Sequence, residues 1–596
     1  MTKPVLPIIQ PAAAVKSRAH PEDIIKDISH KDIAGLNVVF INMPLRETAV
    51  PNTTPEGPLL MATRLRKQYG LAANVIDLNG YRLKDELAQT RNLPNGRHLT
   101  SEEVYRFINE HISYYSTPDI VAFSGMITTL GWQQAVAKIV KRILPKVFLV
   151  SGGGLATELK TALFNYVPEL DAVNHSEGDD TIVKICHDAK TIKNMGLRRA
   201  IESGSLNPYY LGEINNKPRL MYEGDRPRNL DTLPHADLDI LSDNDVIFKH
   251  VFGYEYKLVP SYLGNAVWGV SANNSSAAPS VMTCSTTSVS SRGCPYGCKY
   301  CYRGTQGERN WAVRSAIHIY NQLVNYKELY GIDYHGFPDD NFAVTYGRIQ
   351  DLVPLLGPLG IKWGTHTRLD EAAGLKPKPN YPGEYFFEDP LRVALMAKSG
   401  CNYIGAGPES ACAKTIETLG KGGFTLSNGF MPTKVYGKIY QFPRSMREGI
   451  RNCQEVGIHV NCTWIKGNPN ETLEDLKETV AFMAWQEEYY SQFGTLPEAV
   501  NKKMFTLTWY PGTEIIHHPR VRQELNRVFG LNFNPTTHEP IYDEKFHQYC
   551  LALDDATKVL EGPDGEPLNF SDMPNDTFLR VRELVDSDRT LEILDM

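Results

Sequence analysis

The chain of 596 residues has few of the features that mark membrane, secreted or nucleic-acid-binding proteins. No apolar run approaches the length that spans a bilayer, so we expect no membrane partner. The net charge of −7 offers no basic surface for nucleic acid. Ten cysteines are too few for a disulfide scaffold and fit a reducing compartment. The first 15 residues carry three prolines and do not resemble a signal peptide, so we expect a cytoplasmic protein.

The amino-acid composition and the length indicate a globular protein of several domains. Hydrophobic residues make up 42% and charged residues 22% of the sequence, which is typical of globular proteins. A chain of this length is expected to fold as roughly two to four domains. Residues 1–34 contain prolines and alanines and then charges, and we expect them to form an arm that packs on a later domain.

Residues 35–195 alternate short apolar runs with helical patterns. The first run, Asn37–Asn42, is nearly continuous, as in a buried parallel strand. Five such strands alternating with helices predict an open, doubly wound α/β sheet of Rossmann type, which binds ligands beyond the carboxyl ends of its strands. The other predicted strands are Ala73–Asp77, Asp119–Ser124, Lys146–Ser151 and Asp171–Asn174. The predicted helices are Pro58–Tyr69, Ser101–Tyr115, Gly131–Leu144, Leu155–Tyr166 and Asp179–Asp188.

A second alternation covers residues 280–513, after a predicted linker over 196–279. Six strands, each followed by a helix, predict a partial (β/α)6 barrel with function at the carboxyl ends of the strands. Residues 514–596 are predicted to cap this barrel, with shaping of the substrate pocket as the alternative. The predicted strands are Val281–Val289, Ile332–Phe337, Ile361–Thr365, Cys401–Ala406, Ile458–Lys466 and Lys502–Thr508, and the helices include Val313–Tyr330 and Glu471–Tyr490.

Three cysteines, Cys294, Cys298 and Cys301, follow the first strand of this second unit with the spacing C-x3-C-x2-C. Pro295 and Gly297 force a tight loop, and three converging thiolates form a soft-metal site. Structural zinc usually takes four protein ligands, but no Cys or His follows within the next dozen residues. A 4Fe–4S cluster on three cysteines leaves one iron open for a small molecule. A zinc knot or a chance cluster is the alternative.

This spacing, with Tyr300 just before the last cysteine, resembles the signature of the radical S-adenosylmethionine (radical SAM) enzymes. In that family the open iron of the cluster binds SAM, and an electron from the cluster cleaves SAM to methionine and a 5′-deoxyadenosyl radical. The resemblance implies that Cys294, Cys298 and Cys301 hold a 4Fe–4S cluster and that SAM is a cofactor.

Polar segments after later strands match SAM-binding elements of the same family. Phe337–Phe342 matches a "DDNF"-like segment, Thr365–Asp370 supplies a cation for the SAM carboxylate, and Gly405–Ser410 resembles a "G-x-E-S" element. A helix N-cap is the alternative for the acidic pair, and a surface arginine is the alternative for the cation. The residues that the resemblance implies at the SAM site are Tyr300, Asp339, Asp340, Arg368, Glu409 and Ser410.

The first alternation is similar to the cobalamin-binding domain that precedes many radical SAM barrels. One departure is the absence of any histidine between Met43 and Pro58, where free-standing cobalamin domains carry a cobalt-ligating His. Many radical SAM relatives also lack this His, and some relatives bind no cobalamin. The resemblance implies cobalamin as a cofactor, with contacts from Ser124, Gly152, Gly153, Gly154 and Glu177.

These resemblances imply a radical SAM enzyme that transfers a methyl group to an unactivated carbon or phosphorus of a small molecule, with an electron donor such as flavodoxin or ferredoxin. A cyclisation, a rearrangement or transfer of another SAM-derived group without cobalamin is the alternative within the family. An iron–sulfur electron carrier and a zinc-stabilised binding module are the alternatives outside it. Two long segments, Gly374–Asp389 and Lys421–Pro443, are predicted to form a substrate lid.

Overall fold

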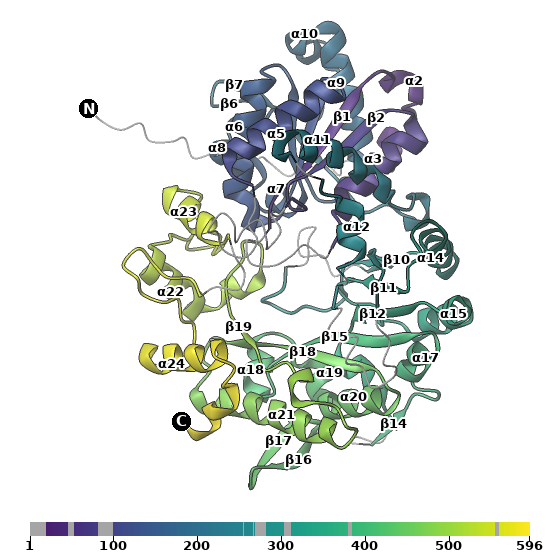
Figure 1. Cartoon of the computed structure of the whole chain (residues 1–596). Coiled ribbons are helices and arrows are strands. Elements are labelled where there is room, and N and C mark those ends of the chain that lie inside the picture. Colours follow the sequence, from purple (N-terminus) through teal and green to yellow (C-terminus); the bar gives the residue numbers. More distant parts are fainter. Residues whose placement is uncertain are drawn as a thin grey trace.

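The structure is a computed structural model that describes residues 19–45, 53–81, 99–253, 255–265, 267–268, 282–302, 311–378, 384–554 and 559–596. Two sheets organise these residues, one of seven strands and one of six. Figure 1 shows the first sheet and its helices above the second, with the C-terminal helices along one side. In the part of the chain that is described, no helix combines the length and the apolar character needed to cross a membrane.

The N-terminal sheet has the strand order β2-β1-β3-β4-β5-β7-β6. Its first five strands pair in parallel, and this confirms the predicted doubly wound sheet. The order 2-1-3-4-5 places a switch point between β1 and β3, where such sheets bind ligands. The strands are β1 (Asn37–Asn42), β2 (Ala72–Asp77), β3 (Ile120–Ser124), β4 (Phe148–Gly152) and β5 (Ala172–His175). The helices are α3 (Glu56–Tyr69), α5 (Ser101–Tyr114), α6 (Leu130–Ile143), α7 (Gly153–Leu159), α8 (Leu163–Tyr166) and α9 (Thr181–Met195).

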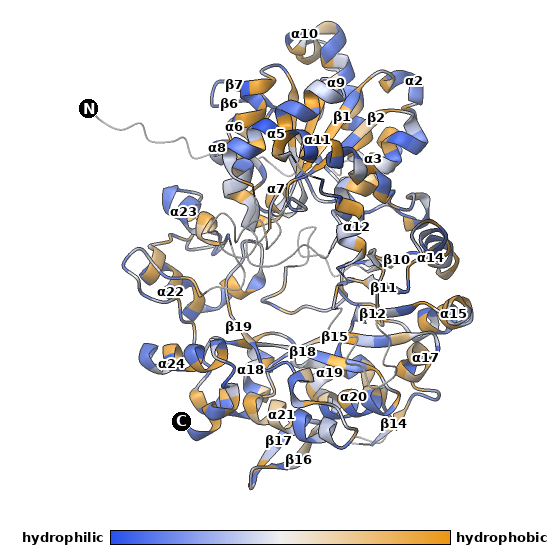
Figure 2. Ribbon diagram, in the orientation of Figure 1, coloured by the Kyte–Doolittle hydropathy of each residue, from blue (hydrophilic) through white to orange (hydrophobic). Residues whose placement is uncertain are grey.

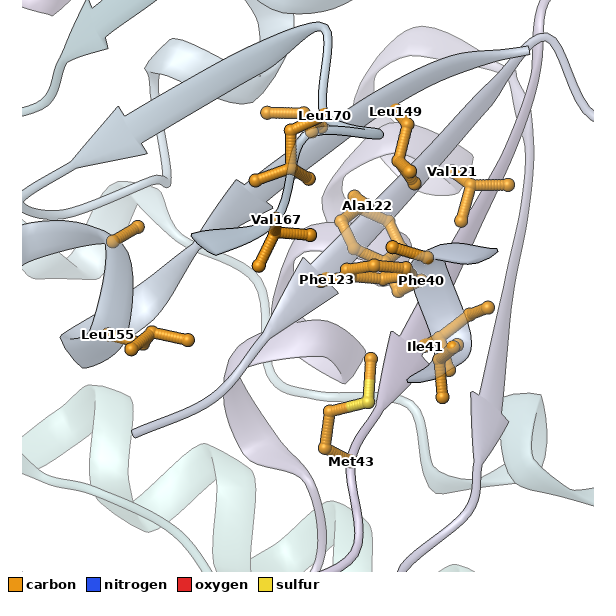
Figure 3. Packing of buried hydrophobic residues seen from close by; sticks show 14 of the residues in the cluster. Phe40, Ile41, Met43, Val121, Ala122, Phe123, Leu149, Leu155, Val167 and Leu170 are labelled. Carbon is orange, nitrogen blue, oxygen red and sulfur yellow. The ribbon is translucent and has the colours of Figure 1, made fainter. Parts of the chain in front are cut away.

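Burial on both faces explains why these strands are continuously apolar. Phe40 and Ile41 of β1 and Val121 and Phe123 of β3 are each at most 2% exposed. Figure 3 shows these side chains packed together between the strands and the covering helices, and Figure 2 shows hydrophobic residues concentrated on the same strands. Removing this apolar surface from water is the main favourable term for the domain.

The sheet continues beyond residue 195, into the segment predicted to be a linker. Two antiparallel strands, β6 (Tyr210–Ile214) and β7 (Lys217–Glu223), form a hairpin, and β7 pairs in parallel with β5. The predicted helix over 155–166 is interrupted, because Lys160 adopts a positive φ of 46° between α7 and α8. The rest of the segment contains α10 (Leu197–Glu202), α11 (Asp243–Phe252) and α12 (Leu258–Leu263).

The second sheet is parallel throughout and has the order β19-β18-β15-β12-β11-β8. It confirms the predicted partial barrel of six strands in chain order. Its first strand is shorter than predicted: the regular pairing with β11 ends at Thr287, and the Ser290 N–H and hydroxyl after it donate to the Asp339 side chain. The strands are β8 (Ser285–Thr287), β11 (Tyr334–Phe337), β12 (Lys362–His366), β15 (Cys401–Glu409), β18 (His459–Lys466) and β19 (Met504–Thr506).

Helices cover the outer face of this sheet. The predicted helices over 313–330 and 471–490 are confirmed, with a capping box of Thr472 and Asp475 at the start of the second. Trp363 and Trp464 lie fully buried between the sheet and these helices. The helices are α14 (Ala316–Tyr330), α15 (Tyr346–Leu356), α16 (Leu369–Ala372), α17 (Arg392–Lys398), α18 (Ala413–Thr418), α19 (Gly422–Ser427), α20 (Arg444–Glu455) and α21 (Leu473–Ser491).

The C-terminal region contacts both domains. Its helices are α22 (Pro519–Phe529), α23 (Glu544–Ala552) and α24 (Asn575–Asp586). His547 of α23 stacks on Tyr166 with the ring centroids 4.5 Å apart, and its Nε2 lies 2.8 Å from Nε2 of Gln134. Phe578 of α24 belongs instead to the barrel core. The region therefore joins the two domains as well as capping the barrel.

The two segments predicted as a substrate lid have different places. In the first, β13 (Leu375–Pro377) pairs with β14 (Tyr385–Phe387), while residues 379–383 lie outside the described residues. In the second, α19 lies near the cysteine loop, but β16 (Phe430–Val435) and β17 (Lys438–Pro443) form a hairpin against α21. Figure 1 shows this hairpin at the end of the barrel domain that is remote from the N-terminal sheet.

Candidate functional site

The cysteine loop lies at the carboxyl end of the barrel sheet, as predicted. It follows β9 (Ser291–Arg292), which pairs with β10 (Ala312–Val313), and it turns at Gly293 with a φ of 79°. The Lys299 N–H donates to the Leu419 carbonyl at 2.9 Å, and the Lys299 carbonyl accepts from the Ile515 N–H at 2.7 Å. The barrel and the C-terminal region therefore both fix the loop.

The three thiols differ in exposure. Cys298 is 8% exposed, Cys294 is half-buried and Cys301 is exposed. Burial raises the pKa of the Cys294 thiol. Among the described residues, no three His, Cys, Asp or Glu side chains are arranged to hold a metal ion directly. The donor set of three thiols on one loop fits a cluster in number and chemistry, and binding would release protons from the thiols.

Arg368 lies beside this loop but is not a free cation. Its guanidinium stacks over the Tyr296 ring at 4.1 Å, and Nη1 lies 3.8 Å from Sγ of Cys298. Nη2 pairs with the Asp370 carboxylate at 2.5 Å and donates to Thr425 at 3.1 Å. Arg368 therefore supports the loop directly in this structure, and its predicted contact with SAM stays a prediction.

Tyr300 and Glu409 form one unit at the mouth of the barrel. The Tyr300 hydroxyl donates to Oε1 of Glu409 at 2.7 Å, and Nζ of Lys421 lies 3.4 Å from the same oxygen. Glu409 adopts a φ of +65°, a strained backbone conformation that residues at functional sites often hold. These side chains bring together the cysteine loop, the end of β15 and the start of α19. They are two of the residues predicted at the SAM site.

The other residues predicted at the SAM site have different surroundings. The Asp339 carboxylate is fully buried and accepts from the Ser290 N–H at 2.7 Å and from the hydroxyls of Ser290 and Ser291 at 2.6 Å each. Asp340 is exposed. The Ser410 hydroxyl lies 2.9 Å from Oγ1 of Thr479 and accepts from the Cys412 N–H at 3.1 Å. Asp339 and Ser410 therefore hold the turns that carry them.

A cavity of about 360 Å³ lies at the carboxyl end of the N-terminal sheet. Four of the five residues predicted to contact cobalamin line it: Ser124, Gly152, Gly153 and Glu177. The fifth, Gly154, faces the ring of Tyr302, because a Cβ built on it would lie 3.6 Å from the Tyr302 hydroxyl. Apolar side chains form much of the wall: Phe40, Leu60, Met61, Ala122, Phe123, Val150, Ile182 and Ile185.

Two observations indicate that this cavity is built for a ligand. Asn174 lines it and is 5% exposed, yet its Oδ1 has no hydrogen-bond partner in the described structure. A buried acceptor of this kind needs a partner to offset its desolvation. Gly153 has a φ of +81°, and a Cβ on it would lie 2.9 Å from the Gly125 carbonyl oxygen. The apolar wall, the free acceptor and the close backbone turn fit a large, mainly apolar cofactor with polar edges.

Two residues just before the cysteine loop also line the cavity, and the sequence did not predict this. Val289 and Arg292 line the cavity, although they belong to the barrel domain. The Val289 N–H donates to Glu56 of α3 at 2.8 Å. The Arg292 guanidinium binds Glu177 and pairs with Asp179 at 2.6 and 3.1 Å. One hint of this role was present in the sequence, which is the closeness of Arg292 to Cys294. No sequence pattern shows which carboxylate an arginine will bind in the folded chain.

The comparisons with known proteins agree with this architecture. No family model matches the chain. It is 25% identical over 431 residues to an uncharacterized methyltransferase of Pyrococcus horikoshii, covering 71% of this chain and 74% of that protein. It is 20% identical over 445 residues to the anaerobic magnesium-protoporphyrin IX monomethyl ester cyclase of Cereibacter sphaeroides, covering 72% of this chain and 59% of that protein.

Two solved structures share the fold over most of the chain. The cobalamin-dependent S-adenosylmethionine radical enzyme OxsB, with aqua-cobalamin and S-adenosylmethionine bound, matches with a TM-score of 0.57 and 15% identity over 93% of this chain and 67% of its own. The radical S-adenosylmethionine methyltransferase TsrM from Kitasatospora setae, with cobalamin and a [4Fe-4S] cluster bound, matches with a TM-score of 0.53 and 14% identity over 90% of this chain and 88% of its own. The predicted resemblance is confirmed: the chain has the fold of cobalamin-dependent radical SAM enzymes.

Proposed function

We propose that this protein is a radical SAM enzyme that uses cobalamin to transfer a methyl group to a small molecule. The observation that carries the proposal is the shared wall: Val289 and Arg292, just before the cysteine loop, line the cavity of the N-terminal domain. A group in the cavity and a cluster on the loop would then face the same space between the domains. Relatives that share this architecture are methyltransferases.

The chain's own residues would bind and orient three cofactors. Cys294, Cys298 and Cys301 would hold a 4Fe–4S cluster, with Arg368 beside the Cys298 sulfur. When bound, the cofactors supply reductive cleavage of SAM and a transferable methyl group. Tyr300 and Glu409 lie where the loop meets the mouth of the barrel, and we assign them to the binding of SAM. Asp340 is the exposed carboxylate at the same mouth.

The N-terminal cavity would hold part of the cobalamin. Its apolar wall suits a ring system, and Oδ1 of Asn174 is the acceptor that a buried N–H or O–H of the ligand would satisfy. Ser124, Gly152 and Gly153 would let the backbone approach closely. Glu177 is already bound by two arginines, so we assign it to the wall and not to direct contact with the ligand.

A second candidate is a radical cyclisation of a similar substrate. The likeness to an ester cyclase, which covers as much of this chain as the likeness to the methyltransferase, favours it. In both cases we expect a small-molecule substrate, reduction by flavodoxin or ferredoxin, and action in the cytoplasm. The few cysteines outside the loop, mostly buried and unpaired, suit a reducing compartment.

The test is anaerobic purification of the full chain with iron, sulfide and hydroxocobalamin supplied, followed by metal analysis and the visible spectrum. Dithionite and SAM are then added, and 5′-deoxyadenosine and S-adenosylhomocysteine are measured. Bound iron and cobalamin with both products support methyl transfer. Iron and 5′-deoxyadenosine without cobalamin would favour cyclisation or another radical outcome. Zinc without a visible chromophore would overturn both candidates.

A further inference from the structure

The residues on either side of the cysteine loop reach across to the N-terminal domain. Arg292, two positions before Cys294, binds both carboxylates of the turn that follows β5, namely Glu177 and Asp179. Tyr302, directly after Cys301, lies over Gly154 in the first turn of α7, which follows β4, and interacts with Glu158. Those two turns also carry Gly152, Gly153 and Glu177, which line the cavity. The loop is thus held at both ends by the turns that form the cavity.

The Arg292 contact is a directed one. Its Nη1 and Nη2 meet the two oxygens of Asp179 at 2.6 and 3.1 Å, which is the bidentate geometry that fixes a guanidinium in orientation. The Asp179 side chain is 8% exposed and the Arg292 side chain 22% exposed, so water screens the pair little. Burial opposes ionisation of Asp179, but Arg292 outweighs it and lowers the pKa of that carboxyl.

The turn over residues 177–179, which Arg292 binds, has little conformational freedom. Nε of Arg226 donates to the other oxygen of Glu177 at 2.7 Å. The backbone of Gly224 lies directly against the Glu177 carbonyl, with no room for a side chain. Arg64 donates to the Asp179 carbonyl and pairs with Asp180, at 2.7 Å each. Arg226, Arg64 and Gly224 therefore hold this turn in place, and Arg292 is bound to a fixed part of the cavity wall.

We propose that Arg292 is a positioning residue that couples occupancy of the N-terminal cavity to the order of the cysteine loop. The proposal rests on the proposed function for the identity of the ligand, hydroxocobalamin, but the contact itself is present in the full chain without it. A ligand that packs against the 177–179 turn holds Arg292, and Arg292 holds Gly293 and Cys294. Conversely, a cluster on the loop holds the cavity wall, because such a coupling is reciprocal.

The test measures amide hydrogen exchange of the peptide that spans residues 293–302 in the full chain. The variant is Arg292→Met combined with Asp179→Asn, which removes one charge of each sign and leaves Glu177 with Arg226. The matched control is Arg228→Met combined with Asp23→Asn, a bidentate pair at 2.7 and 3.0 Å that is half-exposed on the same domain. Exchange of β1 amides in the same spectra reports whether the N-terminal domain stays folded.

Without cobalamin, we expect the loop amides of the Arg292 variant to exchange roughly tenfold faster than those of the wild type, because a local contact that limits opening is lost. The β1 amides and the control variant should be unchanged. Equal exchange of the loop in the variant and the wild type would overturn the proposal. This arm needs no ligand, so its result does not depend on whether the proposed function is right.

With hydroxocobalamin, exchange of the wild-type loop should slow by about fivefold or more, the lower range of measured site-to-site coupling. The Arg292 variant is compared at a hydroxocobalamin concentration that saturates it, as judged by its visible spectrum, and there the cofactor should leave loop exchange unchanged. Slowing of equal size in the variant would overturn the coupling role. Absence of cobalamin binding to the wild type would count against the proposed function. The exchange measured without cobalamin would then decide whether Arg292 orders the loop.

Discussion

The two parallel sheets both end in polar turns, but they use the charges there differently. At the N-terminal sheet, Glu177 and Asp179 bind Arg292 of the other domain. At the mouth of the barrel, Asp339 binds Ser290 and Arg348 of the same domain, and Arg368 binds Asp370 two residues away. Charges at the first sheet therefore set how the domains meet, whereas charges at the second mostly hold its own loops.

Five of the six residues predicted at the SAM site fall into two groups. Tyr300, Glu409 and Asp340 present polar atoms at the mouth itself. Asp339 and Ser410 already satisfy neighbouring groups. A buried polar group that is satisfied contributes to the shape of a site, and removing it costs stability before it costs affinity. Substitutions in the two groups should therefore have different signatures.

The largest effect is expected from Cys298→Ala, which should abolish the cluster and SAM cleavage. Two remaining thiols cannot hold a site-differentiated 4Fe–4S cluster, and Cys298 is the buried member of the three. Iron content and 5′-deoxyadenosine formation measure the loss. Cys284→Ala, outside the loop, is the control and should keep both. SAM cleavage at the wild-type rate by Cys298→Ala would remove the loop from the mechanism.

Gly153→Ala should weaken ligand binding in the cavity of the N-terminal sheet and leave the site at the mouth of the barrel unchanged. The φ of +81° makes a side chain strained by about 1–2 kcal/mol, and its Cβ would lie 2.9 Å from the Gly125 carbonyl oxygen. We expect hydroxocobalamin affinity to fall roughly tenfold while SAM cleavage keeps its rate. Gly131→Ala, whose Cβ would meet only the Leu551 side chain at 3.6 Å, is the control. Equal binding by both variants would mean that the 152–154 turn does not approach the ligand.

A pH effect is expected at the seam between the domains. Burial raises the pKa of Glu158 to about 7, well above the value of 4.5 for a free glutamate. Since the folded state holds this proton more tightly than the unfolded state, stability is greatest below pH 4.5 and falls as pH rises to about 7. Between pH 5.5 and 8 the wild type should lose roughly 2 kcal/mol relative to Glu158→Gln.

Denaturant midpoints of both proteins at the two pH values measure this difference. Glu213→Gln, on the exposed hairpin of the N-terminal sheet, is the control and should follow the wild type. Parallel pH profiles for the wild type and Glu158→Gln would show that the carboxyl is ionised freely and that water reaches the seam beside Tyr302.

The alternation of strands and helices was predictable because local burial dictates it. Asn37–Asn42 and the six barrel strands follow from apolar runs that only a doubly covered sheet can bury. The cysteine loop was predictable because the chemistry requires three thiols close together in the chain. The hairpin of β6 and β7 was not, because β6 has no buried position and so lacks the continuous apolar run of the other strands.

Contacts between the domains could not be predicted for a different reason. Arg292 and Asp179 are 113 positions apart, and Asp179 stands beside two other carboxylates, Glu177 and Asp180. Such a pair forms only when two folded domains pack together, and local sequence patterns do not predict that packing. The same holds for Asn174, whose free acceptor is known only once its surroundings are in place. Sequence patterns thus predicted a cofactor chemistry, and the structure shows which residues join the two domains.

The smallest effect is expected from Ser410→Ala, which separates a turn-holding residue from a ligand contact. Its hydroxyl bonds Thr479 and the Cys412 N–H within the barrel domain, so its loss should cost about 1 kcal/mol of stability and change SAM affinity by less than roughly threefold. Glu409→Gln, one residue earlier, should instead weaken SAM binding by about tenfold or more, because it alters the charge that Tyr300 and Lys421 share. Equilibrium SAM binding and denaturant midpoints for the two variants give both quantities. Ser410→Ala could instead lose as much SAM affinity as Glu409→Gln while its stability stays unchanged. The Ser410 hydroxyl would then contact SAM directly, and the distinction between residues that hold turns and residues that contact SAM would be wrong.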